Sequence, residues 1–559
     1  MLGIAAIARV AAIFTENVNW DEMALLERAE ALVRTGELSG GGRPGLATLV
    51  LAPFAEGCRN AVDAVVRARG LWTMFVGGAI VAFWLLLRGV IPETRMRFLA
   101  VTTGVGLWVL APAFLRYSVQ VRTDQIAILG ALFGGVLLRA SVRRGWVAVP
   151  AGLVMAVGFL ASQKLVYVAG PVFILVAIPH VLERDLRIRR EVARLGLLAL
   201  GFAVTVWGFG QVATWVFGAP PRLVPIEGQM QAFDFYRARS GFLFYWWLLP
   251  TLVAQIVAVA HLLPASVAWL RDSPRRYGGL LLAAWGVLGS MIVVIAFHAG
   301  RFPYFYMVLG LFPATIGALV LAWLLEWFDD PRARVVLLLL IWVPLTWSAV
   351  GEIRWMVRDD LGHQRQALAF VEEAFPAEAR GFEATQAFVC RHDPDPFPTR
   401  FGHQVLDQFA APDGEALARE TIQEFRTRPV SFMIRPTDPN YPASLRDFWD
   451  THYVRYLGAV EIPGRFVGTG GVVDQGVAFE PVVAGAYRWW PDGADVPLLV
   501  DGVSLAPGNT VTLSDSSTVT LTATASGGGI FALDVGRPPA PSSEPFYTLF
   551  LQRLDRSEP

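Results

Sequence analysis

The chain of 559 residues has little lysine and no excess of either charge. Lys164 is its single lysine, and every other residue among its 47 basic side chains is arginine. The 47 acidic residues balance these charges, and the basic residues are spread over many loops instead of forming one stripe. The sequence therefore predicts no nucleic acid or other polyanion as a partner.

The sequence has only two cysteines and no Gly-rich phosphate loop. The two cysteines, Cys58 and Cys390, have neither CxxC spacing nor histidines nearby, which argues against a thiolate metal site. The sequence leaves open whether they pair in a disulfide and gives no reason to favour it. No Gly-rich phosphate loop stands at a strand-to-helix junction, so an enzyme that takes a nucleotide sugar from water is not expected.

Long apolar runs are confined to the first part of the chain. A composition of 54% hydrophobic and 17% charged residues is too apolar for a soluble protein of this length and too polar for membrane spans alone. After Gly351 no stretch reaches the roughly 20 apolar residues of a bilayer-spanning helix. We predict a transmembrane domain over 1–351, an α/β region over 352–471, and a small all-β domain with a tail over 472–559.

The apolar runs predict a mainly α polytopic membrane protein with about 11 transmembrane helices. These runs lie at about 1–15, 70–91, 97–115, 125–142, 146–163, 165–183, 194–218, 242–270, 278–299, 302–328 and 333–351. Residues 44–57 are apolar but short, so they either lie at the interface or extend the second span. Arginine-rich connections alternate with connections poorer in positive charge, and the positive-inside rule places the arginine-rich set in the cytoplasm. The other connections, and everything after Gly351, then face the opposite compartment.

The first external loop begins with two acids on a predicted amphipathic helix. The pattern after Asn19 puts Met23 and Leu26 on an apolar face, and Gly36 is a plausible stop. Such a helix suits the plane of the membrane interface. A purely structural role would also explain the acids Asp21 and Glu22. Asn19 and Glu22 can form a capping box, and both acids complement the helix dipole.

Three further polar segments lie beside apolar runs on the same side. Arg122 and Asp124 precede the fourth span, where Thr123 can cap a helix that holds Asp124 in its first turn. Ionisable groups so close to a span are usually paired or functional, which is the competing interpretation. Lys164 joins two apolar runs with almost no loop, and it either extends to the interface or binds an anion. Arg301, after the ninth span, is either an interface anchor or an anion ligand.

The first loop carries a resemblance to a known family. Trp20, Asp21 and Glu22 follow the first span, and after the amphipathic helix come a Gly-rich turn and a basic-Pro-apolar run that begins at Arg43. This order resembles the polyprenyl-phosphate-dependent membrane glycosyltransferases of the GT-C fold. The most similar groups are the protein O-mannosyltransferases and the aminoarabinose and galacturonic acid transferases of bacterial envelopes. The abundance of Arg, Ala and Gly agrees with a GC-rich bacterial genome.

The resemblance implies a GT-C-like fold and roles for the charged residues. Asp21 is implied as the catalytic base or the acid that orients the acceptor, and Arg122 with Asp124 resembles the family's second acidic motif. The implied catalytic acids are Asp21, Glu22 and Asp124. The implied ligands of the donor phosphate are Lys164, Arg301, Arg122 and Arg43.

These residues suit sugar transfer from a polyprenyl-phosphate-linked donor to an envelope lipid, glycan or protein. Negative charge grows on the departing phosphate while the acceptor loses a proton, so the site needs cations at the phosphate and a carboxylate at the acceptor. A single attack inverts the anomeric centre. No cofactor is required by the pattern, and a divalent metal stays an open option because two acids without a histidine cluster do not define a site. The expected location is the inner (plasma) membrane, with the active site and C-terminal domain facing the periplasm or exterior.

A multispan transporter or flippase of a lipid-linked substrate is the main alternative, and a non-enzymatic envelope scaffold is the third. The sequence shows no paired, interrupted helices that place charges near the bilayer midplane, and a large external domain adds nothing obvious to transport.

The region after Gly351 predicts mixed structure. Residues 363–375 have a helical pattern, and 381–389 read as a strand of a small α/β unit. From about residue 472 short alternating runs predict a β-sandwich or barrel, with a hairpin at Asp501 and Gly502. The aromatic residues Tyr487, Trp489 and Trp490 either bind sugar or pack in a core, and core packing is the commoner fate.

Overall fold

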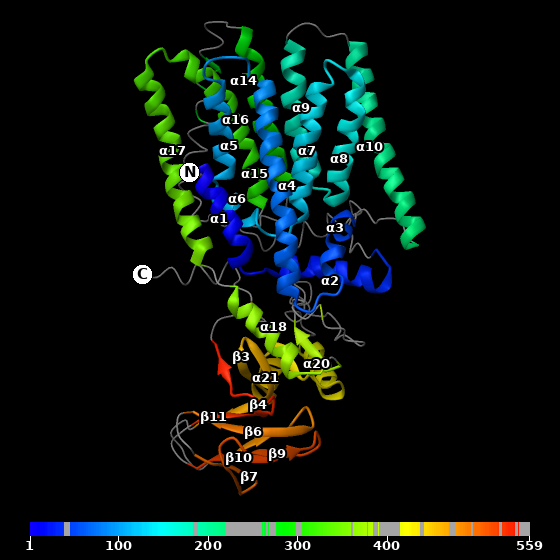
Figure 1. Cartoon of the computed structure of the whole chain (residues 1–559), viewed down its shortest axis with the longest axis vertical. Helices are drawn as coiled ribbons and strands as arrows, with labels where there is room; N and C mark the ends of the chain where they lie inside the picture. Colours follow the sequence, from blue (N-terminus) through cyan, green and yellow to red (C-terminus); the bar gives the residue numbers. More distant parts are fainter. Residues whose placement is uncertain are drawn as a thin grey trace. The chain divides into compact units, whose positions relative to one another are not determined.

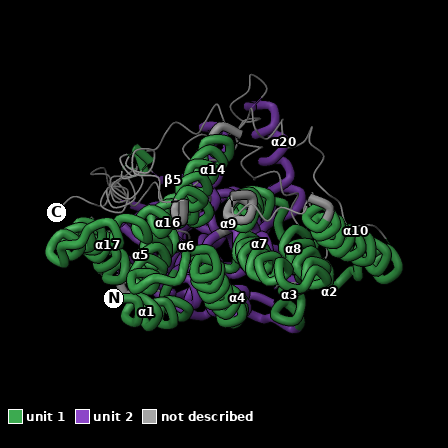
Figure 2. Tube along the Cα trace, turned by 90° about the horizontal axis from the view of Figure 1, so that it is seen from above, with its two compact units in different colours: residues 1–16, 28–56, 65–359 green, residues 17–27, 57–64, 360–559 purple. Residues whose placement is uncertain are grey.

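The computed structural model describes most of the chain and divides it into two compact units. The described residues are 1–38, 45–182, 188–218, 260, 262–263, 266–267, 275–297, 305–358, 361–376, 378–383, 390, 414–435, 441–468, 476–492, 496–524, 528–542 and 546. Unit 1 comprises 1–16, 28–56 and 65–359, and unit 2 comprises 17–27, 57–64 and 360–559 (Figure 2). Two short segments of the N-terminal part therefore belong with the C-terminal region.

Unit 1 is a bundle of helices, most of which run alongside one another (Figure 1). Its helices, some of whose ends belong to unit 2, are α1 (Leu2–Thr15), α2 (Trp20–Thr35), α3 (Leu46–Ala55), α4 (Ala61–Val90), α5 (Arg97–Val109), α6 (Pro112–Tyr117), α7 (Thr123–Ala140), η1 (Gly145–Val147), α8 (Ala148–Ala161), α9 (Leu165–Leu182), α10 (Ile188–Phe217), α14 (Arg275–Phe297), α15 (Phe305–Leu309), α16 (Leu311–Trp327) and α17 (Pro331–Arg358). The prediction of a mainly helical N-terminal region is confirmed.

Six stretches of helix among the described residues are long and apolar enough to cross a bilayer. They are Ala61–Val90, Thr123–Ala140, Arg190–Phe217, Gly278–Ile295, Phe305–Trp327 and Pro331–Met356. Shorter apolar helices include Leu2–Thr15, Arg97–Val109 and Leu165–Ala177. The predicted count of eleven is not confirmed, and the span predicted at 242–270 lies almost entirely outside the described residues. The apolar run at 44–57 forms α3, separate from α4.

Two runs predicted as single spans are not regular throughout. Residues 97–115 contain the break between α5 and α6, where Pro112 occupies the first turn of the second helix. Residues 302–328 contain a one-residue irregularity at Gly310 between α15 and α16, where Pro313 has no N–H to donate to the carbonyl of Leu309. The backbone of Gly310 stays helical, with φ of −61° and ψ of −21°, so Phe305–Trp327 remains one apolar span. The apolar pattern of the sequence predicted neither irregularity.

The two irregular runs pack together. Helix α5 contacts α16 and α6 contacts α15. Trp108 of α5 donates its Nε1–H to the carbonyl of Met307 at 2.9 Å, which satisfies a carbonyl shortly before Gly310. The residues at these two places, Leu110, Ala111 and Gly310, are uncharged. Unit 1 thus contains one broken helix, between α5 and α6, that packs against a span with a local irregularity at Gly310, and neither place carries a charge.

Unit 2 contains two β-sheets. Its strands are β1 (Gly381–Glu383), β2 (Phe432–Ile434), β3 (Tyr453–Gly458), β4 (Val460–Val467), β5 (Val477–Phe479), β6 (Gly485–Pro491), β7 (Leu498–Val500), β8 (Val503–Leu505), β9 (Thr510–Leu513), β10 (Val519–Ala523), β11 (Gly529–Leu533) and β12 (Ala540–Pro541). The larger sheet has the order β1-β2-β4-β11-β6-β9, with β3 pairing with β4 and β12, and the smaller has the order β5-β10-β7-β8. Strand β4 pairs with β2 and β3, which precede residue 471, and with β11, which follows it. The larger sheet therefore contains strands from both of the regions predicted on either side of residue 471.

Apolar side chains from both sheets form one core, so the C-terminal strands make a β-sandwich (Figure 1). Phe479 of the smaller sheet contacts Tyr487 and Phe531 of the larger one at ring-centroid distances of 5.6 and 5.8 Å. Tyr487 and Trp489 are fully buried, which confirms core packing for these two aromatics. The hairpin predicted at Asp501 joins β7 to β8, and both turn residues have positive φ.

The α/β part of unit 2 holds α18 (Gly362–Ala374), α20 (Gly414–Thr427) and α21 (Ala443–His452). Strands β1 and β2 pair in parallel, with α20 between them in the chain, as in a βαβ unit. Cys58 and Cys390 form a disulfide with a Cα–Cα distance of 5.5 Å. The sequence did not favour this bond, because residues 332 positions apart give no spacing signal.

Candidate functional site

The candidate site in unit 1 centres on an acid and the lone lysine. Asp124 lies in the first turn of α7 and is 2% exposed. Lys164, directly before α9, donates from Nζ to Asp124 Oδ2 at 3.1 Å, and Ser162 donates from Oγ to Asp124 Oδ1 at 3.2 Å. The lysine side chain keeps 30% of its surface exposed. The sequence predicted both charged residues, and the structure brings them together.

The segment before α7 is held by a network of amides. Gln125 donates from Nε2 to the carbonyls of Tyr117, Ser118 and Gln120, and its Oε1 accepts the N–H of Arg122. This closes a capping arrangement in which Arg122, not the predicted Thr123, is the N-cap residue. The cap fixes the turn from which Asp124 projects.

Arg122 belongs to a chain of buried polar groups. It donates from Nε to Gln120 Oε1 at 3.0 Å, and Gln120 donates from Nε2 to Glu16 Oε1 at 2.8 Å. Arg69, which is fully buried in α4, donates from Nη1 to the carbonyl of Glu16 at 2.6 Å. The guanidinium of Arg122 also lies 5.7 Å from the ring centroid of Tyr117. This network links the end of α1, α4 and the start of α7.

A second buried charge pair joins α6 to α17. Arg116 donates from Nη2 and Nε to Glu352 Oε2 at 2.9 and 3.2 Å. Its guanidinium also lies over the ring of Trp355, 4.2 Å from the centroid. The two charged side chains retain 11% and 9% of their surfaces. Both ends of the pair are thus desolvated and mutually compensated.

The two predicted acids of the first loop, Asp21 and Glu22, belong to unit 2. Glu22 Oε2 accepts the N–H of Asn19, and Asn19 Oδ1 accepts the N–H of Glu22, each at 3.1 Å. This is the predicted capping box, so the structure gives the buried Glu22 a capping role. Helix α2 ends at Thr35, directly before the predicted stop at Gly36, whose φ is 69°. Asp21 is partly exposed in the first turn of α2.

Two predicted phosphate ligands, Arg43 and Arg301, lie outside the described residues. Conversely, Glu16, Arg69 and Glu352 were not among the predicted site residues. Each carried a signal: Glu16 directly follows the first span, Arg69 lies within a long apolar helix, and Glu352 is an acid inside the last span's helix. An ionisable residue inside a spanning helix is a functional or paired residue by default, and this rule would have identified the last two.

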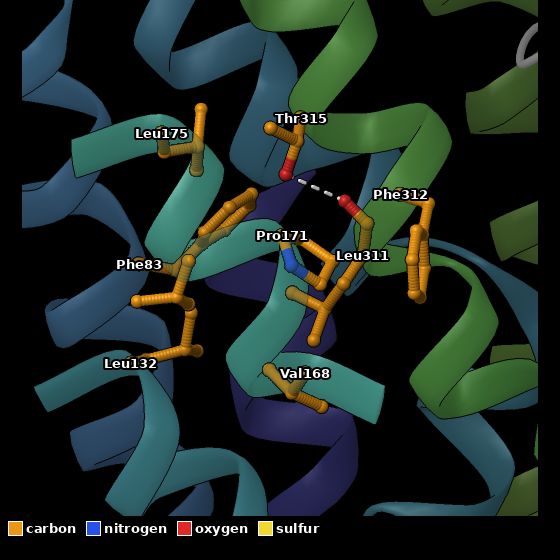
Figure 3. A pocket seen from close by; sticks show the side chains of 9 residues that line it. Phe83, Leu132, Val168, Pro171, Leu175, Leu311, Phe312 and Thr315 are labelled. Carbon is orange, nitrogen blue, oxygen red and sulfur yellow. Dashed lines mark hydrogen bonds between the residues drawn. The ribbon is translucent and has the colours of Figure 1, made fainter. Parts of the chain in front are cut away.

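Among the residues that the structure describes, no group of three or more His, Cys, Asp or Glu side chains is arranged to hold a metal ion. A small cavity lies among α4, α7, α9 and α16 (Figure 3). Its volume is about 10 Å³ and its lining is apolar, except for the hydroxyl of Thr315, which donates to the carbonyl of Leu311 at 2.7 Å. This space is too small for a substrate and offers a water no free polar partners.

Comparisons with known proteins found no family model and no curated relative that matches the chain. Similar solved structures include the apo oligosaccharyltransferase of Archaeoglobus fulgidus, at 11% identity over 91% of this chain and 75% of that chain, with a TM-score of 0.45. Another is that enzyme in complex with an inhibitory peptide and a dolichol-phosphate, at 12% identity over 91% and 75%, with a TM-score of 0.43. The arabinosyltransferase EmbB of Mycobacterium smegmatis is 12% identical over 96% and 64%, with a TM-score of 0.41. Likenesses this low carry no argument about activity.

Proposed function

We propose that the protein is an integral membrane glycosyltransferase that moves a sugar from a polyprenyl-phosphate donor to an envelope acceptor, with inversion. The observation that carries the proposal is the contact of Lys164 with Asp124 at 3.1 Å, beside a helix start and partly open to its surroundings. The buried acid holds the ammonium in place while part of the lysine side chain is exposed. A held cation of this kind suits the departing phosphate, whose negative charge grows during transfer.

The remaining predicted residues would act either on the donor phosphate or on the acceptor. Arg122, and with it Arg43 and Arg301, would add positive charge at the donor phosphate. Asp21 would accept the proton of the attacking hydroxyl or amide, because a carboxylate is the base that such a step needs. Glu22 would support Asp21 through the cap at the start of α2, and Asp124 would act through Lys164.

The disulfide and the loop charges both support an extracytoplasmic site. A bond between Cys58 and Cys390 persists in an oxidising environment, such as the periplasm or exterior. The positive-inside rule independently assigns the same side to the loops that contain Asp21, Asp124 and Lys164. Both lines support a site on the extracytoplasmic face of the plasma membrane, where the acceptor would be an envelope lipid, glycan or protein.

Sugar transfer from a panel of radiolabelled polyprenyl-phosphate sugars tests the proposal in membranes that carry the intact protein. We expect Asp21→Asn and Lys164→Ala to lower transfer at least about a hundredfold at equal abundance, the range for general-base and charge-stabilising groups. The matched control is Arg97→Ala, which removes a cation paired with the exposed Glu93. Transfer by all three variants at the rate of the intact protein would contradict the proposal.

A flippase or transporter of a lipid-linked substrate is the second candidate. The observation in its favour is the broken helix, α5 with α6, which packs against α16 and α15. Broken helices in transporters expose helix ends to a substrate near the bilayer midplane. Here the break between α5 and α6 carries no charge, and the charged residues gather instead near the ends of α1, α6 and α17 and the start of α7.

A further inference from the structure

Val18, two residues before α2, is bonded to a buried glutamine that lies 346 residues further along the chain. Gln364, in the first turn of α18, accepts the N–H of Val18 on Oε1 at 2.8 Å and donates from Nε2 to the carbonyl of Val18 at 2.9 Å. One side-chain amide therefore bonds both backbone groups of one residue, as a neighbouring strand would. All of these residues belong to unit 2.

Every polar atom of the Gln364 side chain has a hydrogen-bond partner. Its Nε2 also donates to the carbonyl of Phe546 at 2.8 Å, so both amide hydrogens and the oxygen have partners. Gln364 is 0% exposed and Val18 is 1% exposed, so no water replaces these bonds. A buried polar group is costly unless it is bonded, and a glutamine placed here holds one backbone position in one orientation.

Val18 directly precedes the cap of α2. Asn19 and Glu22 close the capping box, and Asp21 lies between them in the first turn. The backbone fixed by Gln364 is therefore three residues before Asp21, with a closed cap in between. A change at Val18 would alter where the helix starts and thus where the carboxylate of Asp21 points.

We propose that Gln364 is a positioning residue for Asp21, through which α18 sets the orientation of the segment 17–27 within unit 2. The inference rests on the proposed function, since it assigns Gln364 a role through the base named there. Small displacements of a catalytic group are costly, because about 1 Å can lower the rate by about a hundredfold. Gln364 itself touches no reacting atom.

The test compares Gln364→Met with Arg365→Gln. Methionine keeps the length and volume of glutamine but removes all three hydrogen bonds. The control lies next to it on α18 and loses a half-exposed ion pair with Asp63, which ties down a different N-terminal segment of the same unit. Hydrogen exchange in the intact purified protein reports on the backbone of residues 17–27, and transfer assays report turnover and the KM for the donor.

We expect Gln364→Met to speed exchange in residues 17–27 and to lower turnover at least about tenfold, with the donor KM within about threefold, because positioning acts on the chemical step. The control should change neither. Gln364→Asn, one methylene shorter, replaces the methionine variant if that variant does not accumulate. Exchange that is unchanged in residues 17–27 would overturn the inference.

Two other outcomes separate this inference from the proposed function. If exchange rises and turnover stays intact while Asp21→Asn abolishes transfer, Gln364 does not position the base and the proposed function stands. If Asp21→Asn leaves transfer intact, the proposed function fails for this residue, and the role of Gln364 fails with it even though the exchange result persists.

Discussion

Lys164 is placed where the backbone disfavours a cation. It directly precedes α9, and the amino end of a helix carries partial positive charge. Asp124, buried at the start of α7, offsets this cost through the ion pair at 3.1 Å. In a chain whose other basic residues are all arginine, a compact ammonium at this point indicates a requirement that a guanidinium does not meet.

Replacing the lysine with arginine separates charge from shape. We expect Lys164→Arg to keep the ion pair and the midpoint of thermal unfolding but to lower sugar transfer at least about tenfold, because a planar fork does not reproduce a point charge. The measurement pairs an unfolding scan in detergent with the transfer assay. Full transfer by this variant would show that any cation suffices here.

At the scale of elements, α6 and α17 are joined by the pair of Arg116 and Glu352. Both side chains are almost fully buried, and Trp355 covers the guanidinium. Removing one partner of such a pair leaves an uncompensated charge away from water. The link is therefore expected to matter for stability far more than an exposed pair.

Glu352→Gln should destabilise unit 1 by about 3 to 5 kcal/mol, as expected when one partner of a buried pair is removed. Arg365→Gln, which breaks a half-exposed pair with Asp63, should cost at most about 1 kcal/mol. Denaturant titration in detergent measures both. Equal stabilities of the two variants would mean that water reaches the Arg116 pair.

Local patterns predicted the elements better than the contacts between them. The helix that starts after Asn19, its stop at Gly36 and the hairpin at Asp501 follow from capping, positive φ and alternation over a few residues. The irregularity at Gly310 was not predicted, because Pro313, three residues later, stands inside an apolar run of spanning length. The bond from Gln364 to Val18 has no local signal, since its partners are 346 positions apart.

The candidate site was predictable only in part for the same reason. Asp124 and Lys164 were found as charges at span ends, but their contact required the packing of α7 against α9. Glu16 was overlooked beside the acids of the first loop, although it joins the buried network through Gln120. Composition identifies ionisable residues near a membrane, and only the tertiary structure shows which of them pair.

At the scale of the whole molecule, the disulfide ties an N-terminal loop to the C-terminal region within unit 2. Cys58 lies between α3 and α4, and Cys390 lies 332 residues later. Because the enclosed loop is so long, the bond removes much freedom from the unfolded chain. It also requires that both cysteines meet in an oxidising compartment.

Cys58→Ser should lower the stability of unit 2 by about 2 to 5 kcal/mol, the usual effect of losing a native disulfide. In intact cells, a membrane-impermeant thiol reagent should label neither cysteine of the native protein but should label Cys390 in this variant. Labelling of Cys58 and Cys390 without prior reduction would contradict both the bond and the assigned compartment.

The most direct test of the account uses the purified protein in vesicles that contain a polyprenyl-phosphate sugar labelled in the sugar and, separately, in the phosphate, together with envelope extract as the acceptor. Sugar transfer predicts that the sugar label leaves the lipid while the phosphate label stays on it, and that Lys164→Ala lowers this separation at least about a hundredfold. If both labels cross the bilayer together and remain joined, the protein moves its lipid-linked substrate without cleaving it, and the glycosyltransferase account is wrong.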